Sequence, residues 1–161
     1  MNQVRIFALG GLDEDGKNLT VVEINQDLFV IDVGLKYPDK DRLGVEIIIP
    51  DFKYLIENKQ RIKGIFITHG HDDAMAALPY LIKQVNLPIY TTPLTAKLIE
   101  KLFKEEKLSD YQIKVIKRDD NLNIGKVNIR TFSLTHSIAD AFGIAIESPF
   151  GYIVYAGEYI I

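Results

Sequence analysis

The chain has 161 residues, of which 47% are hydrophobic, and a net charge of −3 from 19 Lys and Arg against 22 Asp and Glu. This is the length of one domain with a real core, and its charge excludes a broadly basic surface that coats nucleic acid. Without cysteine it can form neither disulfides nor thiolate metal sites. It shows neither a signal peptide nor an apolar run of membrane-spanning length, so we expect a cytoplasmic protein with no membrane contact.

The first half predicts short strands joined by turns. Residues 4–9 form one strand, and residues 19–24 and 28–34 form a hairpin because only three polar residues separate their apolar runs. A helix is expected from Asp51 to Lys59, and a strand at 64–68 precedes the polar HGHDD turn. Pro79 is expected in the first turn of a helix that ends near residue 85, where its missing N–H costs nothing.

The second half is richer in strands. After a strand at 87–90 and a helix at 94–107, four strands are expected, at residues 111–116, 126–134, 141–148 and 151–157. Helices interrupt the strands only in the first half, which favours two sheet layers flanked by helices over a doubly wound parallel sheet. The chain ends almost on a strand, and we therefore expect it to be a fragment.

All three histidines of the chain follow predicted strands. His69 and His71 are two residues apart on an extended segment, so both imidazoles can face one ion, and His136 ends another strand. Three neutral imidazoles with an open fourth position form a known catalytic zinc arrangement. The alternative is a polar turn in which Asp72 or Asp73 caps the next helix. The concentration of every histidine in these two places favours the metal site.

Three carboxylates accompany the histidines. Asp73 begins a helix directly after the HGH motif, within reach of a neighbouring ion. Asp32 and Glu158 end two further predicted strands, where each alone could be a solvated turn carboxylate. Taken with the histidines, they predict a cluster at one edge of a two-layer β core. Each strand would deliver one residue at its C-terminal end.

The order of these residues resembles the metallo-β-lactamase fold. Longer segments resemble its β-CASP branch, ribonuclease J: GGLDEDGKN at 10–18, VIDVGLKYPD at 30–39, the run from LGVEIIIPDF to HGHDDA at 43–74, and THSIAD to YAGE at 135–158. The resemblance implies an α+β fold, an αββα metallo-β-lactamase-like sandwich. Residues 1–161 would supply its N-terminal half, and the β-CASP and C-terminal regions would be absent from this chain.

The resemblance also implies metal-dependent hydrolysis of RNA, from the 5′ end and possibly internally, in RNA maturation and decay. His69, His71 and His136 would hold the first ion, which would be zinc, with manganese or magnesium as alternatives. Asp73 would be a ligand of a second ion and Glu158 the bridge between the two. The catalytic residues would be Asp73 and His136.

Two further residues take roles from the resemblance. Asp32 would be a carboxylate behind the ligands that orients the histidine loop, since ligating histidines usually donate their other N–H to such a group. Ser137 would contact a phosphate, although a serine after a strand is more often a turn hydroxyl.

The family pattern predicts a defect at the second ion. Its HxHxDH motif has histidine where this chain has Ala74, and its bridging residue is aspartate where this chain has Glu158. These losses resemble the second, degenerate-site ribonuclease J paralogue of Firmicutes. Alanine has no lone pair and the longer glutamate moves the bridging oxygens outward, so we expect a loss of at least ~10²–10³ in rate.

Three functions remain open at this point. The first is a ribonuclease with an impaired site. The second is a catalytically silent structural or RNA-binding partner of an active ribonuclease J paralogue. The third, a hydrolase of a small ester or thioester, is disfavoured by the long match at 43–59. The expected partners are RNA, a second copy or a ribonuclease J paralogue, and an RNA degradation complex.

Overall fold

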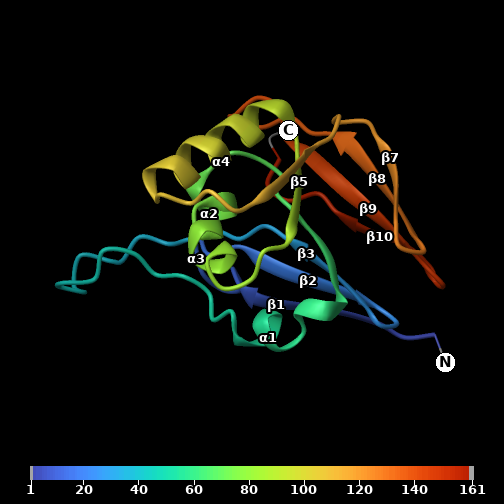
Figure 1. Cartoon of the computed structure of the whole chain (residues 1–161), viewed down its shortest axis with the longest axis horizontal. Helices are drawn as coiled ribbons and strands as arrows, with labels where there is room; N and C mark the ends of the chain where they lie inside the picture. Colours follow the sequence, from blue (N-terminus) through green and yellow to red (C-terminus); the bar gives the residue numbers. More distant parts are fainter. Residues whose placement is uncertain (1, 160–161) are drawn as a thin grey trace.

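The computed structural model describes residues 2–159, which form two β-sheets with helices on one side (Figure 1). The first sheet has the order β1-β2-β3-β4-β5-β6: β1 (Val4–Gly10), β2 (Leu19–Ile24), β3 (Asp27–Ile31), β4 (Ile62–Phe66), β5 (Pro88–Thr91) and β6 (Gln112–Val115). The second has the order β10-β9-β8-β7: β7 (Asn121–Ile124), β8 (Val127–Ser133), β9 (Phe142–Ser148) and β10 (Gly151–Tyr155). The helices are α1 (Lys53–Glu57), α2 (Asp72–Met75), α3 (Leu78–Ile82) and α4 (Pro93–Glu105), with a 3-10 turn at Lys59–Arg61. Among residues 2–159, no helix has the length and hydropathy that crossing a bilayer requires.

Strand β3 shows how the layers are held together. Its Leu28 and Val30 pack into the apolar layer between the first sheet and the helices. Its Phe29 and Ile31 pack into a second layer, against residues of the other sheet such as Ile144. Side chains alternate across a strand, so a strand that is buried on both faces reads as a continuous apolar run.

All four helices contribute buried residues to the first apolar layer. Within the described residues the order of layers is therefore helices, first sheet, second sheet, and no helix covers the outer face of the second sheet (Figure 1). This confirms the expected two-sheet metallo-β-lactamase-like fold and supplies three of the four layers of an αββα sandwich. The predicted hairpin of β2 and β3 is confirmed, and β3 to β6 are parallel to one another.

Two local predictions were wrong. Helix α1 begins at Lys53 rather than Asp51, because the carboxylate of Asp51 accepts a hydrogen bond from the Lys53 backbone N–H (2.9 Å) and forms a turn ahead of the helix. Strand β7 was not expected. It is short and half exposed, and its pairing with β8 depends on a tight turn at Gly125, where φ is +64°.

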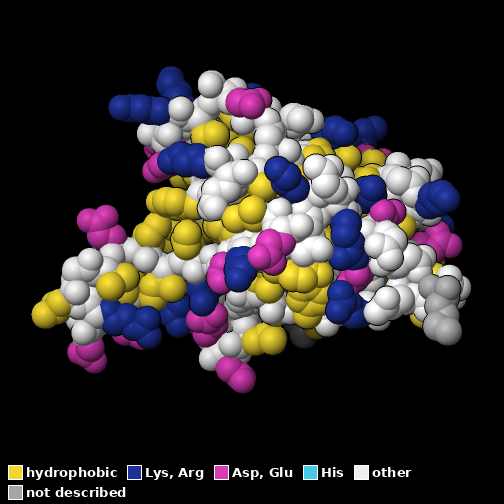
Figure 2. Space-filling view, turned by 60° about the horizontal axis from the view of Figure 1, so that its bottom comes forward, with side chains coloured by type: hydrophobic (Ala, Val, Ile, Leu, Met, Phe, Trp, Pro, Cys, Tyr) yellow, Lys and Arg dark blue, Asp and Glu magenta, His cyan; other side chains and the backbone are white. Residues whose placement is uncertain are grey.

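Charged side chains of both signs are interspersed on the face that carries α1 and β1. Figure 2 shows this face with Lys and Arg beside Asp and Glu, with hydrophobic side chains between them and no continuous basic band. No histidine is visible on it. The view agrees with the slightly negative net charge and offers no broad electrostatic surface to a nucleic acid on this side.

The segment that follows β3 is held against α2. Segment 33–35 donates two backbone hydrogen bonds, of 2.7 and 3.0 Å, to carbonyl groups of segment 72–74. Gly34 lies in the middle of this contact, where a Cβ atom would stand 1.4 Å from the carbonyl oxygen of Asp73. Only glycine fits, because a side chain there would have to push two hydrogen-bonded backbones apart.

The close contact predicts a large effect of Gly34→Ala. The methyl group forces segment 33–35 away from α2, and we expect a loss of about 3 kcal/mol or more in the free energy of unfolding, at the upper end of overpacking effects. Urea denaturation measures it. The control is Gly44→Asn, since a Cβ at Gly44 meets nothing within 4 Å and asparagine tolerates its φ of +81°. Equal denaturation midpoints for the two variants would contradict the prediction.

Candidate metal centre

Four strand ends bring the candidate residues to one edge of the two sheets. Asp32 follows β3 and His69 follows β4, both in the first sheet. His136 and Glu158 follow β8 and β10 in the second sheet. The two sheets stack on each other, so residues far apart in sequence meet where the strands end.

The three histidines form one cluster. The ring centroid of His69 lies 4.9 Å from that of His71 and 4.4 Å from that of His136, and the remaining pair is 4.9 Å apart. One nitrogen of each ring lies within 4.8 Å of the other two. In the described part of the chain, His69 Nε2 and both nitrogens of His136 are buried without a hydrogen-bond partner. Buried polar atoms rarely go unpaired, so these lone pairs fit a cation.

A second group shares one of these histidines. Ligand atoms of His69, Asp73 and Glu158 also lie within 4.8 Å of one another, with Asp73 Oδ1 3.7 Å from His69 Nε2. The neighbouring Asp72 is exposed and instead accepts a hydrogen bond from the hydroxyl of Tyr37 (2.7 Å). Together the two sets of residues form a cluster of three imidazoles, with the carboxylates of Asp73 and Glu158 beside His69.

Helix α2 positions Asp73 without using it as a cap. The residue before the helix is His71, and no side chain caps this end, so the alternative in which Asp72 or Asp73 caps it was wrong. Ala74, in the position where the family pattern has histidine, is fully buried. Its methyl group can bind no ion, which leaves the second group one ligand short of that pattern.

Asp32 is connected to His69 through another residue. Its carboxylate accepts hydrogen bonds from the backbone N–H (2.9 Å) and the hydroxyl (3.0 Å) of Thr68, and the same hydroxyl lies 3.0 Å from His69 Nδ1. When Asp32 is ionised, the Thr68 hydroxyl donates to the carboxylate and accepts from His69 Nδ1–H, and this tautomer leaves a lone pair on Nε2. Sequence reasoning missed Thr68, although it directly precedes His69.

Burial sets the protonation of this chain of groups. It raises the pKa of Asp32 to about 7, against the opposing hydrogen bonds from Thr68. Burial, followed by the charges of His136 and His71, lowers the pKa of His69 to about 4, against an opposing effect of Glu158. His69 is therefore neutral at neutral pH, and Nε2 can bind a cation without first losing a proton.

Two further residues lie close to the site, Ser137, which was predicted, and Asn18, which was missed. Ser137 is exposed on the loop beside His136, and no hydrogen bond joins its hydroxyl to the described site residues. Asn18 was not singled out, yet its Nδ2 lies 3.1 Å from Asp73 Oδ2 and 3.5 Å from Glu158 Oε1. Its place at the end of the GGLDEDGKN turn gave no sign of this contact, which depends on the stacking of the sheets.

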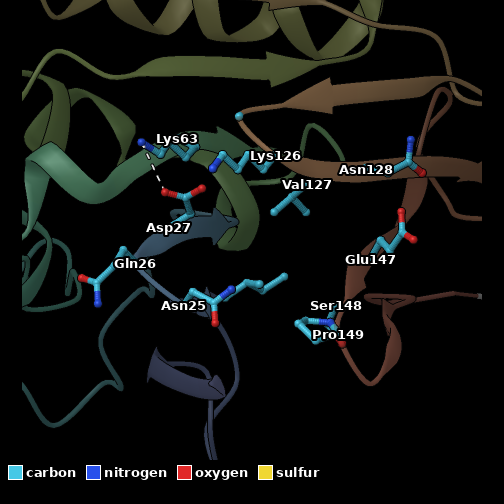
Figure 3. Close-up of a pocket in the computed structure, with 12 residues that line it drawn as sticks. Asn25, Gln26, Asp27, Lys63, Lys126, Val127, Asn128, Glu147, Ser148 and Pro149 are labelled. Atoms are coloured by element: carbon cyan, nitrogen blue, oxygen red, sulfur yellow. Dashed lines mark ion pairs between the residues drawn. The ribbon is translucent and has the colours of Figure 1, made fainter. Parts of the chain in front are cut away.

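A separate cavity opens at the opposite ends of the same strands. Its volume is about 670 Å³, and the turns that precede β3 and β8 and follow β9 line it (Figure 3). Lys63 pairs with Asp27 there (3.3 Å), and Lys126 and Glu147 add one charge of each sign. None of the site residues lines this cavity, and both metal-binding groups found within residues 2–159 lie at the other edge.

Comparisons with known proteins agree with the geometry. A family model described as "Beta-lactamase superfamily domain" matches residues 46–159. Ribonuclease J 2 of Staphylococcus epidermidis is 40% identical over 157 residues and that of Staphylococcus saprophyticus is 41% identical, each over 97% of this chain. The chain spans only 28% of the length of these relatives.

Two solved structures share the fold at 15% sequence identity. A protein of unknown function from Enterococcus faecalis aligns with a TM-score of 0.73, over 99% of this chain and 44% of its own. The short form of human tRNase Z aligns with a TM-score of 0.60, over 100% of this chain and 71% of its own. At this identity the likeness supports the fold alone.

The raised pKa of Asp32 predicts a pH-dependent stability in the metal-free protein. Its folded carboxyl keeps a proton up to about pH 7, whereas the unfolded carboxyl titrates near 3.8, so its contribution to stability is complete below pH 3.8 and is lost as the pH rises towards 7. Asparagine at position 32 keeps the left-handed backbone (φ +60°) but cannot titrate.

We therefore expect the free energy of unfolding of the wild type, minus that of Asp32→Asn, to fall by several kcal/mol from pH 4 to 7, at about 1.4 kcal/mol per pKa unit. Urea denaturation with a chelator measures it. Asp13→Asn is the control, because Asp13 is an exposed aspartate with a similar φ of +52°. A difference that does not change with pH would show that Asp32 is ionised throughout.

Proposed function

The chain belongs to the β-lactamase superfamily, and we propose that it is the N-terminal part of the catalytic domain of a ribonuclease J-type, metal-dependent RNA hydrolase. The observation that carries this proposal is the cluster of His69, His71 and His136, in which His69 Nε2 and both ring nitrogens of His136 are buried and have no hydrogen-bond partner within residues 2–159. The relatives at 40–41% identity, described as ribonuclease J 2, support RNA as the substrate. Zinc suits an imidazole cluster best, with manganese or magnesium as alternatives.

The residues of the chain have separable tasks in this proposal. A bound ion would act as a Lewis acid that polarises the phosphodiester and activates water. Thr68, held by Asp32, keeps the Nδ1–H tautomer of His69, so that Nε2 faces the cluster. Asp73, half-buried beside His69, would be a ligand of the second ion, with Oδ1 on the side of His69 Nε2. Glu158, on the exposed side, would be the bridging carboxylate.

We infer that the second ion is held weakly and that hydrolysis is slow. Ala74 presents a methyl group in place of an imidazole, and Glu158 is longer than the aspartate of the family pattern. In a two-metal hydrolase both ions stabilise the developing charge on the substrate. A second ion that is bound weakly is absent from many molecules, which reduces the rate. The enzyme would attack RNA from its 5′ end and could also cleave it internally. Its role would be in RNA maturation and decay in the cytoplasm.

RNA would be held locally rather than by a broad surface. The chain is slightly acidic, and the face in Figure 2 mixes both charge signs. Binding would therefore depend on the metal centre, on Ser137 beside it and on parts of the protein beyond residue 161. Assembly with a second copy or with a ribonuclease J paralogue, in an RNA degradation complex, belongs to the same proposal.

A second candidate function is a catalytically silent partner of an active paralogue. The buried alanine at position 74 favours it, because a subunit kept only for assembly and RNA binding has no need of a second ion. Hydrolysis of a small ester or thioester is disfavoured, since the relatives at 40–41% identity are described as ribonucleases.

Metal content separates the two candidates. In the full-length protein, dialysed without chelator, we expect about one zinc per chain by elemental analysis. The double variant Ala74→His, Glu158→Asp should bind two and hydrolyse RNA at least ~10²-fold faster, because it restores a fixed ligand and a shorter bridge. His69→Ala is the negative control and should bind none.

Other outcomes would change the proposal. No bound metal, with RNA binding intact and an inert double variant, would mean a silent partner subunit. Wild-type turnover equal to that of a relative with an intact HxHxDH motif would show that the second ligand set is not limiting.

A further inference from the structure

The turn between β1 and β2 ends at Asn18, beside the metal centre. The side-chain amide of Asn18 donates to Asp73 Oδ2 (3.1 Å) and lies within reach of Glu158 Oε1 (3.5 Å). Asp73 belongs to α2, and Glu158 follows β10 of the second sheet. One amide therefore contacts both carboxylates of the site, although one comes from a helix and the other follows a strand of the second sheet.

The main chain of Asn18 is fixed on two sides. Its N–H donates to the carbonyl oxygen of Asp73 (3.0 Å), and its own carbonyl accepts from the N–H of Gly34 (2.9 Å). Its side-chain oxygen lies so close to Gly11 that a Cβ atom on Gly11 would be 2.7 Å away from it. These contacts hold the amide in one orientation, with its N–H groups turned towards the carboxylates.

The two oxygens of Asp73 consequently have different surroundings. Oδ2 accepts from Asn18, while Oδ1 lies 3.7 Å from His69 Nε2, on the side of the ligand cluster. We propose that Asn18 is a positioning residue that selects which oxygen of Asp73 faces the metal and steadies Glu158 beside it. This inference rests on the proposed metal centre and names a residue that acts through Asp73 without touching the ion.

A purely local role for Asn18 is the competing explanation, since asparagine is common in turns. Such a role would be carried by the backbone hydrogen bonds to Asp73 and Gly34, which any residue can make. The contact of the side-chain amide with the two carboxylates is independent of these backbone bonds. Replacing the side chain removes the amide contact and leaves the backbone hydrogen bonds available. A change in metal binding would therefore indicate the positioning role, and unchanged metal binding the local role.

The test is a cobalt(II) titration of the full-length protein, followed by the visible absorption of the bound ion. Asn18→Ala should weaken the binding of the second, more weakly held cobalt ion by about 10–100-fold, the usual effect of losing a group that orients a ligand, and should leave the ion held by the three histidines bound. It should also shift the absorption bands, because Asp73 would bind with a different geometry. Asn86→Ala, at an exposed asparagine in the loop before β5, is the matched control and should match the wild type.

A double-variant cycle makes the test specific. In an Asp73→Ala background, Asn18→Ala should cause little further loss, because the oxygen that it positions is gone. Circular dichroism checks that each variant is folded. If Asn18→Ala does not fold, Asn18→Ser replaces it, since serine also suits turns but is too short to reach Asp73 in the same way.

The outcomes separate this inference from the proposed function. Wild-type affinity and spectrum in Asn18→Ala, or an equal loss with and without Asp73, would overturn the positioning role and leave the metal centre intact. A wild-type protein that binds no cobalt would overturn both. If Asn18→Ala weakens cobalt binding in the wild-type background but has no further effect in the Asp73→Ala background, both the inference and the proposed function are supported.

Discussion

The backbone contact between segments 33–35 and 72–74 sets the position of the whole candidate site. Hydrogen bonds hold the two segments together, and a glycine at position 34 lets them approach closely. The first segment directly follows Asp32 at the end of β3, and the second lies in α2 and contains Asp73. The site can therefore be assembled only when sheet and helix are in this register, and the fold and the chemistry depend on the same contact.

Burial around that contact controls the state of the polar groups. A buried histidine that is kept neutral has a free lone pair, and a buried carboxylate that is fully hydrogen-bonded can hold its neighbour in one tautomer. His69 and Asp32 show these two effects, with Thr68 between them. Unpaired nitrogens would be costly in a core that had no ligand for them, which is why the cluster fits a metal centre better than a packing motif.

Much of the fold was predictable because local patterns carry it. The double-sided apolar run of β3, the hairpin with β2 and the proline in the first turn of α3 each have a local physical cause. Strand β7 was missed because only two of its four residues are half-buried and its partner strand decides its conformation. The histidines and carboxylates were predicted by their positions at strand ends, whereas Thr68 and Asn18 were missed because their roles lie in contacts.

The amino-acid sequence limits the possible chemistry, because it has three histidines and no cysteine, carboxylates at strand ends, and alanine at position 74 in place of a further ligand. These are properties of residue type and spacing, which do not depend on the path of the chain. Which atoms come into contact depends instead on how the chain folds. The stacking of the two sheets brings His136 and Glu158 to His69, and the packing of α2 on the first sheet brings Asp73 to Asn18. Such contacts between distant segments follow from packing and cannot be read from local order.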